Sequence, residues 1–212
     1  MKVELLNHTP LSVADIAICK CYGNTPHEDK DKVQARINRV ANVSKHASTI
    51  EHISYSFDID GISRACLQEL ARHRLASYTV KSSRYTLQEL KDEEDIIVRH
   101  LSGKEVNHNI ASKYVVLTGN IDVDNSICVA LSNLQNRVKD GTSNDVAKYC
   151  MPEAYKTSLV MTINARSLQN LLELRSSKHA LLEIQNLARE IYNVIPDDHK
   201  FLYNIGEDNV NK

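Results

Sequence analysis

Cationic and hydroxyl side chains gather in the stretch RHRLASYTVKSSRY, residues 72–85. Its cations are Arg72, His73, Arg74, Lys81 and Arg84, and its hydroxyl groups include those of Ser77, Thr79, Ser82 and Ser83. Guanidinium forks, hydroxyls and loop amides are the groups that bind phosphate oxygens. Any one arginine is more often a solvated surface charge, but few acids lie close enough in sequence to neutralise this set. The stretch therefore predicts a site for a phosphate-bearing ligand.

A second basic set lies near the C-terminus and comprises Arg166, Arg175, Lys178 and His179. Two such sets indicate two phosphate-bearing ligands or one long one. The six glycines are nowhere spaced as GxGxxG, and no P-loop is present, so side chains rather than a glycine-rich loop must hold a nucleotide. These residue types predict a polyanion site but specify no reaction.

The charge balance of the whole chain limits which polyanion is bound. Lys and Arg number 26 against 27 Asp and Glu, for a formal net charge of -1, so no general attraction to nucleic acid or to a membrane surface is expected. Only 5% of residues are aromatic and none is Trp, which argues against a base-stacking RNA surface. A phosphate-binding RNA module is thus a weaker alternative to a small nucleotide site.

The N-terminus and the cysteines bear on compartment and metal content. MKVELLNHTPLSVADIAICKCY lacks a long apolar run, which fits neither a signal peptide nor a membrane span and predicts a cytoplasmic protein. The five cysteines form no CxxC pair, and the nine histidines show no HExxH spacing. We therefore expect buried thiols, with no disulfide framework and no metal site.

The spacing of apolar residues predicts the helices and strands that must position these residues. We expect a helix start at Thr9-Pro10 and helical spacing from Val33 to Val40. Strands are expected at 52–60 and 158–164, and helices at 62–72, 127–138 (capped by Gly141), 165–174 and 178–194, the last stopped before Pro196. LKDEEDIIVRHL, residues 90–101, is predicted to be an exposed charged helix. The prediction is an α+β, helix-rich single domain over residues 1–212, with a central, mostly antiparallel sheet.

At these residues the sequence resembles the flavin-dependent thymidylate synthases. The family signature is RHR, a spacer, then Ser and an Arg two residues later, and it stands here as Arg72-His73-Arg74 followed by Ser82-Ser83-Arg84. Upstream, HASTIEHISYSF is similar to the family's segment around His-x-Ser/Thr-x-x-Glu-His. Downstream, NARSLQNLLELR is similar to its Asn-Ala-Arg segment and the following Leu-Arg. Three separated blocks in the right order are far more specific than one short motif.

The resemblance implies the fold of that family and a reaction. The implied enzyme is a homotetramer with active sites between subunits, which binds FAD as cofactor. It makes dTMP from dUMP, with methylenetetrahydrofolate as carbon donor and NADPH as reductant. The positions that match the family's FAD site are Ser48, Arg72, His73, Arg74, Asn164, Arg166 and Asn170.

The resemblance also assigns the substrate site. The dUMP positions are Glu69, Arg72, Ser82, Ser83, Arg84, Lys148 and Arg175. Arg175 has the catalytic role, in which its permanent charge stabilises the negative charge that develops as the uracil ring is polarised. Without the resemblance, an arginine that caps helix carbonyls is the favoured interpretation of Arg175. Ser82 lacks a supporting His or Asp at a suitable spacing, so a substrate-binding role is favoured over a nucleophile.

This chain departs from the family pattern at several site positions. Thr79-Val80 replaces the Asn-Glu that many members carry, Glu69 replaces a glutamine, and Lys148 replaces an arginine that reaches the dUMP phosphate. Lysine keeps the charge but loses bidentate geometry. These changes leave open a family member that binds FAD and nucleotide without turnover.

Overall fold

The computed structural model describes residues 1–100 and 103–203 and divides the chain into two compact units. Unit 1 comprises Met1–Asp60, Glu69–Thr79 and the chain from Leu159 onward, and unit 2 comprises Gly61–Gln68 and Val80–Ser158. The single domain expected from the sequence stays a prediction. The mixture of helices with a β-sheet confirms the α+β class.

The main sheet has the strand order β1-β2-β6-β3, and most of its residues belong to unit 1. The strands are β1 (Lys2–His8), β2 (Ser54–Ser63), β6 (Lys156–Asn164) and β3 (Ala76–Val80). β1 pairs antiparallel with β2, so that Val3 lies opposite Ile59. Tyr55, Phe57 and Ile59 are fully buried, which confirms the alternation that predicted β2. β1 was not expected from the sequence.

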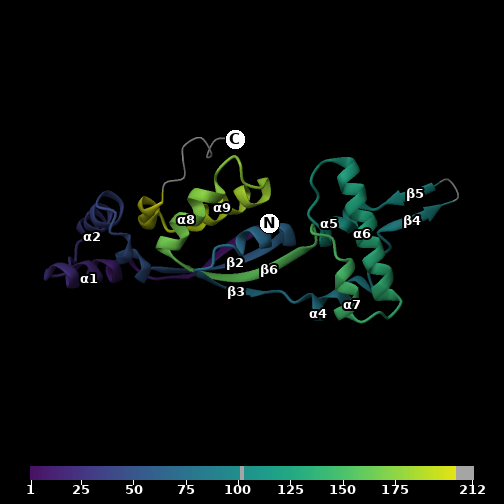
Figure 1. The fold of residues 1–212 in the computed structure, drawn as a ribbon, viewed down its shortest axis with the longest axis horizontal. Coiled ribbons are helices and arrows are strands. Elements are labelled where there is room, and N and C mark those ends of the chain that lie inside the picture. Colours follow the sequence, from purple (N-terminus) through teal and green to yellow (C-terminus); the bar gives the residue numbers. More distant parts are fainter. Residues whose placement is uncertain (101–102, 204–212) are drawn as a thin grey trace. The chain divides into compact units, whose positions relative to one another are not determined.

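Unit 1 has helices along the sheet and others beyond one end of it (Figure 1). They are α1 (Leu11–Tyr22), α2 (Lys30–Ile37), a π-helix (Asn38–Val43), 3-10 helices at Ala47–His52 and Asp197–Leu202, α8 (Ala165–Arg175) and α9 (Leu182–Val194). α9 packs against β1, and α8 packs against α9 and the 47–52 helix. The Asn164 side chain caps α8 by accepting a hydrogen bond of 2.8 Å from the Ser167 amide. α8 is thereby fixed directly after β6.

The boundary between β2 and the next helix differs from the prediction. β2 continues through Gly61, which has φ 75°, to Ser63, and α3 spans only Arg64–Leu70. Because glycine adopts positive φ without steric cost, the Asp60-Gly61 pair does not end the strand. The predicted helix at 62–72 is therefore wrong at both ends. Arg72, His73 and Arg74 lie in the turn after α3 rather than on its surface.

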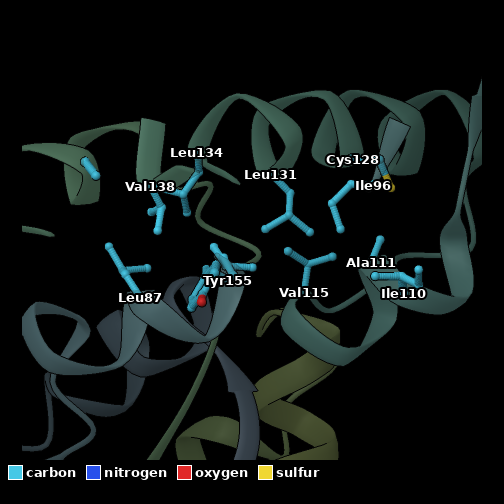
Figure 2. Close-up of a cluster of buried hydrophobic side chains, with 12 residues drawn as sticks. Leu87, Ile96, Ile110, Ala111, Val115, Cys128, Leu131, Leu134, Val138 and Tyr155 are labelled. Carbon is cyan, nitrogen blue, oxygen red and sulfur yellow. The ribbon is translucent and has the colours of Figure 1, made fainter. Parts of the chain in front are cut away.

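Unit 2 has its own hydrophobic core, shown in Figure 2. Its elements are α4 (Ser83–Thr86), a 3-10 helix (Leu87–Leu90), α5 (His108–Tyr114), α6 (Ile121–Lys139), α7 (Asn144–Ala147), a 3-10 helix (Lys148–Cys150) and a hairpin of β4 (Ile97–His100) and β5 (Gly103–Val106). The apolar stripe of Cys128, Leu131, Leu134 and Val138 on α6 faces this core. The predicted helix at 127–138 is confirmed, and Gly141 follows it with φ 81°.

The charged helix predicted at 90–101 is wrong. Its acidic part is a turn, and Ile97–His100 forms β4, while Leu101 lies outside the described residues. The buried Gln135 amide donates to the carbonyls of Leu90, Glu93 and Glu94 and accepts from the Ile96 amide. Consecutive β-branched residues (Ile96, Ile97, Val98) favour strand over helix, and the partner that fixes the turn is remote in sequence.

Two further properties bear on the sequence predictions. Cys19, Cys66 and Cys128 are buried free thiols, as expected, but Cys21 and Cys150 are exposed. Among the described residues, no helix is both long and apolar enough to cross a membrane.

Candidate active site

The Arg175 guanidinium, at the C-terminal end of α8, is held at each of its three nitrogens within unit 1. Its Nη1 lies 2.6 Å from Oε2 of Glu69, its Nη2 donates to the Glu69 carbonyl at 2.9 Å, and its Nε donates to Nε2 of His73 at 3.0 Å. Its side chain is only 12% exposed. The helix-capping interpretation is thus partly right, because one contact is to a carbonyl at the end of α3. The two remaining N–H bonds of the fork are left for a ligand.

His73 is buried and neutral. Burial, followed by the nearby Arg175 and Arg72 charges, lowers its pKa, and Glu69 only partly offsets this. Because Nε2 accepts a hydrogen bond from Arg175, the neutral ring carries its proton on Nδ1. His73 therefore offers a neutral N–H donor among arginines, which suits an acceptor atom of a bound ring better than a phosphate.

A cleft of about 580 Å³ in unit 1 collects most of the predicted cofactor set. It is lined by Arg72, His73, Arg74, Leu75, Arg166, Ser167, Asn170, Leu174 and Arg175. The turn after α3 supplies one wall, and one side of α8 supplies the other, since Arg166 and Asn170 are four residues apart and so share a helix face. Arg72, His73 and Arg74 of the first basic set and Arg166 and Arg175 of the second therefore line one cleft, whereas the other members of the two sets do not border it.

Two adjoining clefts share residues with this one. A cleft of about 430 Å³ is lined by Ser48, Lys45, His46 and Arg166 among others, and one of about 660 Å³ by Lys45, Arg166, Asn170 and Glu173 among others. Arg166 borders all three clefts, so Ser48 belongs to the same continuous surface. Asn164 borders none of them, and its side chain caps α8 instead.

Glu69 and Arg72 lie at the edge of the site. The Glu69 carboxylate contacts Arg175 and also lies 3.5 Å from Nη1 of Arg72. The Arg72 side chain is 71% exposed, so this second contact is weak. The acid that replaces the usual family glutamine is therefore neutralised mainly by Arg175.

The remaining predicted substrate residues lie together in unit 2. Ser82 precedes α4, and Ser83 and Arg84 form its first turn. Arg84 Nε contacts Asp145 Oδ1 at 2.6 Å, and the Asn144 amide donates to the Arg84 carbonyl at 2.7 Å. These contacts join α4 to α7, which is followed at once by the exposed Lys148. Within the described residues, the Ser82 and Ser83 hydroxyls have no protein partner.

Three features of the site were missed by the sequence analysis. Leu75 and Leu174 give the cleft apolar walls suited to a flat ring, Ser167 adds a hydroxyl, and Lys45 borders two clefts. Ser167 and Leu174 could have been found from helical spacing, because they lie three and four residues from Asn170, about one turn of α8 away. No local signal marks Lys45. In the described part of the chain, no group of three or more His, Cys, Asp or Glu is arranged to hold a metal ion.

Comparison with known proteins identifies the family. Residues 4–198 match the family described as thymidylate synthase complementing protein. The chain is 50% identical to a flavin-dependent thymidylate synthase of Campylobacter jejuni, over 96% of each chain, and 49% identical to one of Wolinella succinogenes, over 98% of this chain and 100% of the relative. The crystal structure of the flavin-dependent thymidylate synthase of Helicobacter pylori, complexed with FAD and dUMP, superposes with a TM-score of 0.88 at 43% identity, over 99% of each chain. This chain belongs to the flavin-dependent thymidylate synthase family.

Proposed function

We propose that this chain converts dUMP to dTMP by reductive methylation, with FAD bound in the cleft between the 72–74 turn and α8. Methylenetetrahydrofolate is the carbon donor and NADPH the reductant. The observation that carries the proposal is the convergence of Arg72, His73, Arg74, Arg166 and Asn170 on one cleft whose end is formed by the restrained Arg175.

The donor set of this cleft fits FAD. Arginine forks suit the pyrophosphate, the neutral His73 N–H and the Asn170 amide suit the acceptor atoms of the isoalloxazine ring, and Leu75 and Leu174 suit its apolar part. When bound, FAD supplies the hydride chemistry of the reaction. The protein supplies binding, orientation and charge.

Arg175 is suited to the uracil ring of dUMP. Its fixed guanidinium stabilises negative charge that develops on the ring, and its three protein contacts hold it in place before the substrate binds. Ser82, Ser83, Arg84 and Lys148 are the phosphate-binding set, because they combine free hydroxyls with two exposed cations on neighbouring short helices. Lys148 acts here as a point charge rather than a fork.

The proposed assembly is a homotetramer with active sites between subunits, and a cytoplasmic location remains the sequence prediction. Leu75, which lines the FAD cleft, is 77% exposed, as expected for a side chain that a second subunit covers. Light scattering after gel filtration should give four times the chain mass of 23.9 kDa. A monomer at micromolar concentration would contradict this assembly.

The function is tested by anaerobic incubation of the purified protein with FAD, NADPH, dUMP and methylenetetrahydrofolate, followed by chromatography for dTMP. We expect dTMP that depends on each of the four compounds. Bound FAD and dUMP without dTMP would support the alternative, a non-catalytic family member. A protein that binds no flavin would contradict the proposal altogether.

A further inference from the structure

Lys45 has a backbone conformation that is costly for lysine. Its φ is 59°, and among the described residues it is the one non-glycine residue with positive φ. The reason for the conformation is local: the π-helix Asn38–Val43 ends here, with the Ser44 amide donating to the Arg39 carbonyl and the His46 amide to the Val40 carbonyl. Such a helix end commonly places a left-handed residue after the cap, and glycine is the usual choice. The fold therefore explains the conformation but not the lysine.

The Lys45 side chain makes no compensating contact with the protein. It is exposed, and within the described residues its ammonium group takes part in no hydrogen bond or ion pair. The same holds for the Arg166 guanidinium. By contrast, Arg36, Lys81 and Arg84 each contact a carboxylate. Lys45 and Arg166 are thus cations without a protein counter-ion.

These two cations border the same two clefts. Lys45 and Arg166 both line the cleft that contains Ser48, and both line the cleft that contains Asn170. They come from segments far apart in sequence, the end of a π-helix and the first turn of α8. A residue with a strained backbone that lines a cleft, and that has no protein counter-ion for its charge, is typical of a ligand-binding position. Arg166, which lines the same clefts, also lacks a protein counter-ion.

We propose that Lys45 binds, together with Arg166, an oxyanion of a ligand that extends beyond the FAD cleft. This inference rests on the proposed function. The chemistry required is a phosphate or carboxylate group, which the reaction offers from three sources: the pyrophosphate of FAD, the phosphates of NADPH and the carboxylates of the folate. Lys45 is a binding residue here and takes no part in the chemical step.

Three substitutions of Lys45 separate the charge from the backbone conformation. Lys45→Gly removes the charge and suits the left-handed backbone, Lys45→Asn removes the charge and tolerates that backbone, and Lys45→Arg keeps the charge. Lys32→Asn is the matched control, because Lys32 is an exposed lysine of α2 that borders none of the three clefts.

Binding is measured in three arms: the Kd of FAD for the apoprotein by flavin fluorescence, and the KM values of NADPH and of methylenetetrahydrofolate in the dTMP assay. In Lys45→Gly and Lys45→Asn, we expect one of these constants to rise by about three- to tenfold, which is typical of losing one partly exposed charge-assisted contact. Lys45→Arg should stay within about twofold of wild type. The arm that changes identifies the source of the oxyanion.

Stability distinguishes binding from a structural role. Lys45→Gly should leave the Tm unchanged or raise it by about 2–4 °C, since it relieves the left-handed strain of a side chain without protein contacts. Unchanged constants in all three arms, or a fall of several degrees in the Tm of Lys45→Gly, would overturn the inference. The proposed function would stand in either case, provided that the wild-type protein forms dTMP. A wild-type protein that binds no FAD would instead overturn the proposed function.

Discussion

His73 accepts a hydrogen bond of 3.0 Å from Nε of Arg175, so a residue of the RHR turn orients the guanidinium at the end of α8. The contact requires an imidazole that carries no proton on Nε2. Burial, together with the neighbouring arginines, lowers the pKa of His73 and so favours this neutral form. The turn that contains His73 and the end of α8 that contains Arg175 are therefore joined by a hydrogen bond that depends on the protonation state of His73.

Replacing Arg175 should separate flavin binding from turnover. In Arg175→Ala we expect kcat to fall by at least about 100-fold, the usual effect of removing a group that stabilises developing charge, while FAD stays bound. Arg175→Lys should recover little, because lysine lacks the planar fork that contacts Glu69 and His73 together. Stopped-flow flavin absorbance and product chromatography measure the two properties. An Arg175→Ala enzyme with near-normal kcat would remove the catalytic role.

Glu69→Gln should strengthen dUMP binding. The carboxylate lies against Arg175 and near Arg72, so it adds negative charge to the proposed site of dUMP, which is itself a dianion. Glutamine can still accept a hydrogen bond from Arg175 without the charge. We expect the Kd of dUMP, measured by calorimetry, to fall by about two- to fivefold at low salt, and the difference to shrink at high salt. A weaker complex would mean that the carboxylate itself contacts the substrate.

Arg84→Ala should weaken dUMP binding with little loss of stability. Its contact with Asp145 is an exposed ion pair, with both side chains about 60% accessible, and such pairs contribute about 0–1 kcal/mol. Loss of a phosphate contact should raise the Kd of dUMP by about tenfold. Arg137→Ala is the matched control, since Arg137 pairs with Asp140 on the same unit at similar exposure. Equal dUMP affinity in the two variants would contradict the phosphate assignment.

Stability should decrease on the acid side of neutrality. His73 and His199 are buried, and burial lowers the pKa of each. Nδ1 of His199 forms a hydrogen bond of 2.8 Å with the Tyr55 hydroxyl. Because their folded-state pKa values lie below the unfolded value of about 6.5, the unfolded state binds more protons below that pH. The two histidines therefore contribute their full stabilisation above about pH 6.5. This stabilisation is lost as the pH falls from there through their lowered folded-state pKa values.

Scanning calorimetry from pH 8 to pH 5 tests this dependence. His199→Gln should lower the Tm at pH 8, because it disturbs a buried contact, but should flatten the fall between pH 6.5 and pH 5 relative to wild type. His179→Gln is the control, since His179 is exposed, and its profile should follow that of wild type. Identical slopes for all three proteins would mean that His199 does not titrate differently on unfolding.

Local sequence patterns alone predicted much of the secondary structure of this protein and its family. Short-range features predicted several elements directly: the alternation of apolar residues in β2, the apolar stripe of α6 and the end of α9 before Pro196. The three sequence blocks predicted the family. The boundary at Gly61 and the β4–β5 hairpin were mispredicted. Positive φ at glycine let the strand continue, and the buried Gln135 fixed a turn where charge patterning favoured a helix.

Tertiary structure decided how the site residues relate to one another. The sequence could name Glu69, His73 and Arg175 but not their mutual contacts, and it could not show that members of both basic sets line one cleft. The sequence assigned no role to Lys45, because the clefts that it borders also require Arg166 of the distant helix α8. Side-chain type and spacing are encoded locally, whereas burial, pairing and pKa depend on groups far apart in the chain that only the folded structure brings together.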